Sequence, residues 1–230
     1  MKKIGILGGM SPEASIKYYR LFVDLAKEKE SYGNYPELII YNLNFEDFCN
    51  PVSSDRHEEV IELLQTKLKA IENAGADFAL MASNTPHMYY SDLKEDIPIP
   101  LLSIVKATAD AASERELQKV GLLGTNFTMN SNFYPEELLN HGIKTVIPNE
   151  QDRDYVHHKI MNELVGGDFR EGTRKKLTEL IRKLKKEENI DGVVLGCTEL
   201  PLILSEEEVG VPVLDTTRIH VEAALEFASR

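Results

Sequence analysis

The chain repeats itself at a nearly constant spacing. Lys3–Gly8 matches Lys119–Gly124 position by position. Two further pairs follow in the same order, with spacings of 116, 114 and 112 residues for the three pairs: Asp77–Thr85 with Asp191–Glu199, and Ile99–Ser103 with Val211–Asp215. Three matches in the same order and at nearly the same spacing favour duplication over a chance similarity between hydrophobic segments. The chain is therefore expected to hold two copies of one unit.

Each copy alternates short β-branched or Leu-rich runs with longer amphipathic stretches, a pattern typical of βα units that build a parallel sheet. Strands are predicted at Lys3–Leu7, Glu37–Asn44, Asp77–Ala82, Leu101–Ile104, Lys119–Gly124, Lys144–Ile147, Gly192–Gly196 and Val211–Leu214. Helices are predicted at Pro12–Glu28, Asp55–Ala74, Lys106–Arg115, Asp152–Val165, Glu171–Lys185 and Arg218–Ser229, with shorter ones from His87 and from Met129.

We expect an α/β protein of two similar flavodoxin-like domains, with parallel sheets related by pseudo-twofold symmetry. The first domain comprises residues 1–105 plus 211–230, and the second comprises residues 106–210. Ligands of open α/β sheets bind at the carboxyl ends of the strands. The active site is therefore expected in a cleft between the domains.

Composition excludes several classes of protein. A chain of 230 residues with 42% hydrophobic residues supports a core, and no apolar run approaches the roughly 20 residues that cross a bilayer. The apolar run at the N-terminus is too short for a signal peptide, which predicts a cytoplasmic protein. A net charge of −12 argues against nucleic acid as a partner. Two Cys and six His show no zinc-binding spacing, so no metal is predicted.

Cys197 is the strongest candidate for chemistry. It follows a predicted buried strand and Gly196, and the backbone amides that open the next segment are expected to lower the pKa of its thiol. The repeat puts Ser83 at the equivalent position, so this hydroxyl and the thiol are expected to face each other. The alternative for Cys197 is a buried structural cysteine.

Small polar residues follow both of these strands. Asn84, Thr85 and Thr198 offer amide and hydroxyl groups that can hold a carboxylate, although such residues are also common turn formers. His87 is expected to cap a short helix, to line the cleft or to have a structural role. Cys49 is expected in a loop and has no counterpart in the repeat. The Gly8–Ser11 segment lacks the GxGxxG and Walker patterns, which disfavours a nucleotide site.

Five segments together resemble the aspartate/glutamate racemase family, and the resemblance covers essentially the whole chain. They are Gly8–Ser11, Ser83–His87, Leu123–Thr125, Gly196–Leu200 and Asp215. The resemblance implies a racemase that needs no pyridoxal phosphate or other cofactor, acts on aspartate or glutamate, and forms a homodimer.

In that family two cysteines flank the substrate Cα, one removing the proton and the other delivering a proton to the opposite face. Carried onto this chain, the second cysteine is Cys197, and the first falls on Ser83. The residues that hold the α-carboxylate correspond to Asn84, Thr85 and Thr198. Met10 and Thr125 would line the rest of the pocket.

Ser83 departs from the family pattern at a catalytic position. A serine hydroxyl is a far weaker acid than a thiol and hence a poor general base, so racemisation is expected to be impaired or one-sided. Ser83 is either a replacement introduced to trap substrate or the natural residue of a branch with a changed function. Arg56 or a lysine is a candidate for binding the distal carboxylate. The alternatives are a single-cysteine decarboxylase or isomerase of the same superfamily, and a small-acid binding protein without turnover.

Overall fold

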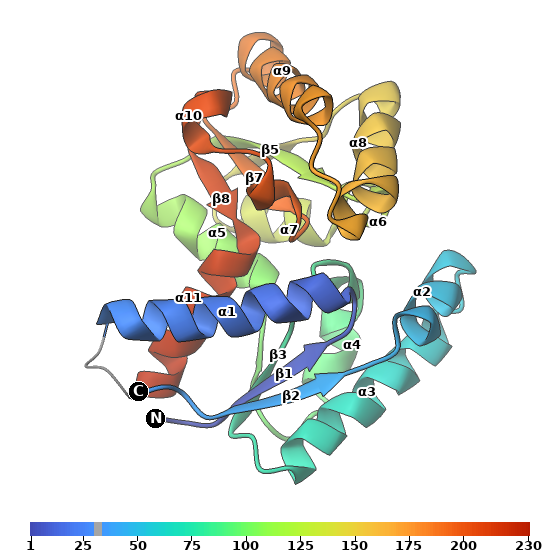
Figure 1. Ribbon diagram of the computed structural model, residues 1–230, viewed down its shortest axis with the longest axis vertical. Helices are drawn as coiled ribbons and strands as arrows, with labels where there is room; N and C mark the ends of the chain where they lie inside the picture. The colour runs from blue at the N-terminus through green and yellow to red at the C-terminus, as the bar shows by residue number, and fades with distance from the viewer. Residues whose placement is uncertain (30–33) are drawn as a thin grey trace. The chain divides into compact units, whose positions relative to one another are not determined.

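The computed structural model describes residues 1–29 and 34–230, which divide into two α/β units (Figure 1). Unit 1 comprises Met1–Ile104 together with His220–Arg230, and unit 2 comprises Val105–Ile219. Each unit contains a four-stranded sheet in which every pair of neighbouring strands is parallel. The expected fold class, two similar α/β units with parallel sheets, is confirmed.

The two sheets have corresponding strand orders, β2-β1-β3-β4 and β6-β5-β7-β8. The strands of unit 1 are β1 (Ile4–Gly8), β2 (Leu38–Asn42), β3 (Phe78–Met81) and β4 (Leu101–Leu102). The strands of unit 2 are β5 (Lys119–Gly124), β6 (Lys144–Val146), β7 (Gly192–Gly196) and β8 (Val213–Asp215). Strands matched by the repeat therefore occupy the same place in their sheets.

Helices connect the strands in both units. Before the chain reaches β5 they are α1 (Pro12–Lys29), α2 (Phe45–Ser53), α3 (His57–Asn73), the 3-10 helix η1 (Thr85–Tyr89), α4 (Tyr90–Lys94) and α5 (Ile104–Glu114). After β5 they are α6 (Asn126–Met129), α7 (Phe133–Asn140), α8 (Glu150–Asn162), η2 (Leu164–Gly166), α9 (Glu171–Glu188), η3 (Leu200–Leu202), α10 (Glu206–Val209) and α11 (Thr216–Ser229).

In unit 1, α1 and α11 cover one face of the sheet. Alternate residues of β1 and β3 point to this face because side chains alternate along a strand. The buried cluster there consists of Ile4, Ile6, Tyr18, Phe22, Leu25, Phe78, Leu80, Ala82, Val221, Ala224, Leu225 and Ala228. The last four residues lie on α11, so the end of the chain completes the core of unit 1.

The opposite face of β1 receives α3 at a glycine. A Cβ atom at Gly5 would lie 2.2 Å from Cγ2 of Ile71, so only glycine lets the helix approach this closely. Gly121, the matching residue of β5, has a looser contact, with Cδ1 of Ile190 3.0 Å from the Cβ position. In unit 2 side chains of α8 and α9 share the buried cluster with β5 and β7.

Two expectations differ from the structure. The segment expected as a loop around Cys49 is helix α2, in which Phe48 and Val52 are buried one turn apart. Pro51 lies in its last turn and interrupts the helical pattern in the sequence. Burial raises the pKa of the half-buried Cys49 thiol.

The second difference concerns the return of the chain from unit 2. Residues 211–230 are expected to belong to the first domain, but the chain returns from unit 2 to unit 1 only after Ile219. The reason is that β8 pairs with β7, with Val213 opposite Val193 and Asp215 opposite Leu195, and so completes the second sheet. Within the described ranges, we find no helix that combines the length and apolarity needed to span a membrane.

Candidate active site

In unit 1, the two segments predicted to bind substrate leave neighbouring strands at the same edge of the sheet. Leu7 pairs with Met81, and the N–H of Ala82 donates to the carbonyl of Leu7 over 2.8 Å. Met10 and Ser83 follow these strand ends and are buried, with exposed fractions of 7% and 9%. Within this unit the structure therefore brings the glycine segment and the Ser83 segment together.

The glycine segment is held by close backbone packing. Gly9 has a φ of +90°, and a Cβ atom there would lie 2.1 Å from the carbonyl oxygen of Leu43. Its N–H donates to the hydroxyl oxygen of Ser15 over 2.8 Å, and that hydroxyl donates to Oδ1 of Asn42 over 3.0 Å. The backbone conformation and packing at this position thus require glycine. Contacts with Leu43 and Ser15 fix the segment that carries Met10.

Asn84 and Thr85 lie at the start of η1, shortly after the end of β3. Asn84 is 3% exposed, Thr85 is half-buried, and Pro86 lies in the first turn. The carbonyl of Asn84 accepts a hydrogen bond from the N–H of His87 over 3.0 Å.

The imidazole of His87 turns inward. It is 2% exposed, and its Nδ1 lies 2.9 Å from the carbonyl oxygen of Ser83. Burial is the main reason that its pKa falls to about 4. The ring therefore contacts the backbone of a site residue, which agrees with the structural role among those expected for His87.

In unit 2, Thr125 and Cys197 follow strand residues that are direct partners. Gly124 of β5 pairs with Gly196 of β7, and a Cβ atom at Gly124 would lie 3.0 Å from the carbonyl oxygen of Gly196. The next residue of each strand is a candidate site residue. The hydroxyl oxygens of Thr125 and Thr128 lie 3.5 Å apart.

The thiol of Cys197 is hydrogen-bonded to a carboxylate that we did not predict as a site residue. Its Sγ donates to Oε2 of Glu199 over 3.0 Å, and the hydroxyl of Thr198 donates to the same oxygen over 2.7 Å. Glu199 is 3% exposed. We expected a helix N-terminus beside Cys197, but the following 3-10 helix η3 has only three residues. The thiol of Cys197 thus lies next to a buried carboxylate that Thr198 also contacts.

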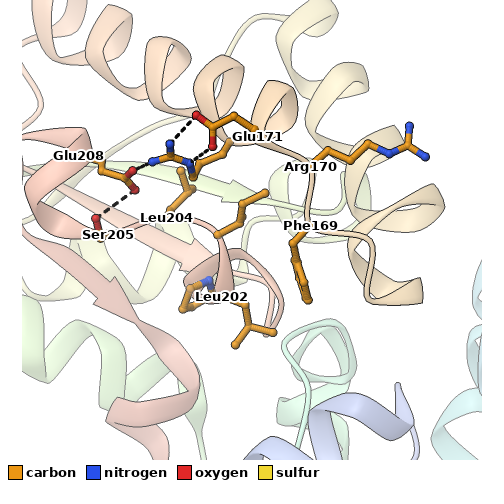
Figure 2. A pocket seen from close by; sticks show the side chains of 10 residues that line it. Phe169, Arg170, Glu171, Leu202, Leu204, Ser205 and Glu208 are labelled. Atoms are coloured by element: carbon orange, nitrogen blue, oxygen red, sulfur yellow. Dashed lines mark hydrogen bonds and ion pairs between the residues drawn. The ribbon is translucent and has the colours of Figure 1, made fainter.

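Unit 2 also contains a pocket of about 420 Å³ that none of the predicted site residues lines (Figure 2). One wall comes from the segment 201–205, which begins four residues after Cys197, and the other from Phe169 to Arg174. Arg174 pairs with Glu171 over 2.6 Å and with Glu208, while Arg170 pairs with Asp168 over 2.6 Å. The arginines at this pocket therefore have acidic partners within the unit.

The structure pairs Arg56, the residue considered for a distal carboxylate, with Glu59 over 2.6 Å at the surface of unit 1. Asp215, which the resemblance singled out, accepts hydrogen bonds from the N–H groups of Thr217 and Arg218 and so caps α11. In residues 1–29 and 34–230, no three His, Cys, Asp or Glu side chains are grouped so that they could hold a metal ion.

Comparisons with known proteins agree on one family. The model of the Asp/Glu/Hydantoin racemase family matches residues 7–224. The chain is 38% identical to an aspartate racemase homologue from Pyrococcus horikoshii OT3, with all of both chains covered and a TM-score of 0.90. It is 26% identical to the aspartate racemase of Picrophilus torridus, covering 99% of this chain and 94% of that one, with a TM-score of 0.79.

A curated relative supports the same assignment. The broad specificity amino-acid racemase RacX of Bacillus subtilis (strain 168) is 24% identical over 222 residues, which cover 93% of this chain and 92% of RacX. The family model matches residues 7–224, and the two similar structures cover 100% and 99% of the chain. The chain therefore belongs to the Asp/Glu/hydantoin racemase family and to the isomerase class of enzymes.

Proposed function

We propose that this chain racemises aspartate, glutamate or a close analogue without a cofactor. Cys197 is the acid or base on one face of the substrate Cα, and Ser83 stands at the opposing position. The observation that carries the proposal is the thiol of Cys197, held at the end of β7 by a hydrogen bond to the buried Glu199. The similar structures include an aspartate racemase and an aspartate racemase homologue, which supports an acidic amino acid as substrate.

The groups proposed to bind the α-carboxylate come shortly after the ends of β3 and β7. Asn84, Thr85 and Thr198 hold the α-carboxylate through amide and hydroxyl donors. Hydrogen bonds to this carboxylate stabilise the negative charge that spreads onto it when the α-proton leaves. Met10 and Thr125 line the remainder of the pocket.

Ser83 makes the reaction asymmetric. The base that removes an α-proton must be a strong, desolvated anion, and a thiolate is accessible near neutral pH whereas a serine alkoxide is not. Cys197 can take and return a proton on its own face. Ser83 can at best relay one through water, so this chain exchanges the proton of one enantiomer faster than it inverts the centre.

The test is proton NMR of L- and D-aspartate and L- and D-glutamate in heavy water, combined with optical rotation. The chain itself, Ser83→Cys and Cys197→Ala are compared. We expect exchange from one enantiomer in the unaltered chain, racemisation in Ser83→Cys, and a loss of exchange of roughly 10² to 10⁴ fold in Cys197→Ala.

The same samples distinguish the alternatives. If no substrate exchanges its α-proton even in Ser83→Cys, the racemase proposal fails. Release of carbon dioxide from a malonate-type acid would then assign a single-cysteine decarboxylase. Thermal stabilisation by these acids with no turnover would assign a binding protein.

We further propose that the protein is cytoplasmic and forms a homodimer, as is usual in the family. The net charge of −12 favours a soluble protein that does not bind nucleic acid. Sedimentation equilibrium tests the homodimer: a mass near twice the 26.0 kDa of one chain supports it, and a mass near that of one chain contradicts it.

A further inference from the structure

The buried imidazole of His87 connects two strand ends of unit 1. The ladder between β3 and β4 stops at Leu80 and Leu102. Beyond it, the His87 ring lies between the carbonyl of Ser83, 2.9 Å from Nδ1, and the N–H of Ile104, 3.1 Å from Nε2. The ring thus links the backbones that follow the two strands, beyond the last residues paired in the ladder.

These partners fix the tautomer of His87. The N–H of Ile104 can only donate, so Nε2 is the acceptor and carries no proton. The proton is then on Nδ1, which donates to the carbonyl of Ser83. A protonated ring would place two donors face to face at Ile104. Burial lowers the pKa of His87 to about 4, which keeps the ring in this neutral form near neutral pH.

A second buried histidine supports the first. The ring of His220 lies edge-on to that of His87, with centroids 6.0 Å apart. Its Nε2 donates to the carbonyl of Leu102 over 3.2 Å, and its Nδ1 accepts from the hydroxyl of Tyr18 over 2.9 Å. The last carbonyl of β4 is therefore held by α11, and α11 in turn is held by α1.

The carbonyl that His87 holds belongs to the peptide between Ser83 and Asn84. This peptide is trans, so the N–H of Asn84 points opposite to the Ser83 carbonyl. Turning the carbonyl inward toward His87 therefore directs the N–H of Asn84 away from the ring. Asn84 is one of the residues that we propose to hold the α-carboxylate.

We propose that His87, supported by His220, is a positioning residue that fixes the Ser83–Asn84 peptide for binding of the substrate α-carboxylate. This inference rests on the proposed function and adds a residue to it. His87 acts through the backbone and does not touch the reacting atoms.

Two substitutions separate the two bonds of the ring. His87→Asn puts an amide near the Nδ1 position and keeps the donor to Ser83, whereas His87→Gln reaches the Nε2 position and loses that donor. Each variant removes one buried hydrogen bond, so a merely structural role predicts the same effect from both. The positioning role predicts a difference between them.

Binding of L- and D-aspartate is measured by calorimetry, together with thermal unfolding of each variant. We expect Kd for the preferred enantiomer to rise about tenfold in His87→Gln and to stay within about twofold of the unaltered chain in His87→Asn, at similar melting temperatures. His57→Asn is the matched control. His57 bonds the hydroxyl of Tyr89 over 2.9 Å in the same unit, and its replacement should leave Kd unchanged. Equal Kd values in the two His87 variants would overturn the proposal.

Nitrogen NMR provides a readout that does not depend on substrate. We expect the Nδ1–H tautomer for His87 and the Nε2–H tautomer for His220, and we expect the amide signal of Asn84 to shift in His87→Gln but not in His87→Asn. The opposite tautomer of His87, or an Asn84 signal that moves equally in both variants, contradicts the positioning role. If these signals behave as expected but no amino acid binds or exchanges, the proposed function fails and the arrangement of the peptide stands.

Discussion

The thiol of Cys197 donates a hydrogen bond to the carboxylate of Glu199, with Sγ and Oε2 3.0 Å apart. Both groups belong to unit 2, and the carboxylate is buried. A negative charge at this distance makes the thiolate more costly to form and, once it has formed, a stronger base. Glu199 therefore influences which protonation state of Cys197 meets the substrate.

Replacing Glu199 by Gln should increase the reactivity of Cys197. The amide removes the negative charge but keeps a polar group of the same shape, so we expect alkylation by iodoacetamide near pH 8 to accelerate about threefold or more. The experiment uses a Cys49→Ala background, in which Cys197 is the single thiol of the chain. An unchanged alkylation rate would show that the carboxylate does not control the thiol.

The buried histidines make stability depend on pH. Burial lowers the pKa of His87 to about 4 and that of His220 to about 3, whereas both lie near 6.5 in the unfolded chain. Between these values the unfolded state binds more protons, so the free energy of unfolding falls as pH drops below about 6.5. Each histidine contributes up to about 1.4 kcal/mol per pH unit in this window.

Urea unfolding between about pH 7 and pH 5 measures this dependence, with His220→Gln as the comparison. Gln keeps a donor for the carbonyl of Leu102 but does not titrate. Unfolding of the variant should therefore take up roughly one proton fewer, which makes the slope of the free energy of unfolding against pH smaller. His141 acts in the opposite sense, because its hydrogen bond to the Glu137 carbonyl and the neighbouring Asp110 raise its pKa. His141 is present in both proteins and so does not affect their comparison. Equal slopes of unfolding free energy against pH in the two proteins would contradict the assignment of a lowered pKa to His220.

Gly9→Ala should destabilise unit 1 far more than Gly75→Ala. Both glycines have positive φ, +90° and +95°, so both substitutions carry a backbone cost of about 1 kcal/mol. At Gly75 nothing lies within 4 Å of the added Cβ, whereas at Gly9 the Leu43 carbonyl oxygen lies 2.1 Å away. We expect an additional loss of about 2 kcal/mol or more at Gly9, measured by urea unfolding. Similar losses at both positions would rule out the steric argument.

The duplication allows a comparison between equivalent glycines. Gly5→Ala should cost more stability than Gly121→Ala, because Cγ2 of Ile71 lies 2.2 Å from the Cβ position in unit 1 and Cδ1 of Ile190 lies 3.0 Å away in unit 2. Ile71→Ala removes the obstructing methyl group. In a double-mutant cycle, Gly5→Ala should therefore be about 1 kcal/mol or more less costly when Ile71 is already Ala. Strict additivity of the two substitutions would argue against the contact.

The sequence predicts the strands and their carboxyl ends well because buried parallel strands are continuous apolar runs. Ser83 and Cys197 stand out for the same reason, since each is a polar or reactive residue directly after such a run. The expected boundary at residue 211 differs from the observed division after Ile219, although the repeat aligns Val211–Asp215 with Ile99–Ser103. That alignment already assigns β8 to the second sheet, as β4 belongs to the first.

Other features depend on contacts that no local pattern shows. Tyr18 and His220 are 202 residues apart and bond only in the folded unit. Glu199 follows Cys197 by two residues, but acidic residues after strands are also common in turns, so the sequence alone does not predict its bond to the thiol. The sequence does not predict helix α2 because Pro51 interrupts the short apolar pattern formed by Phe48 and Val52.

The division of the chain also sets the order in which its cores can form. Unit 2 is a single continuous segment, Val105–Ile219, whereas unit 1 needs His220–Arg230 to complete the cluster that includes Val221 and Ala224. Synthesis proceeds from the N-terminus, so the ribosome joins the last residue of unit 2 before the last apolar side chains of unit 1 exist. The unit whose synthesis begins first is thus the last to have its full sequence, and until then the apolar side chains of α1 lack part of their covering.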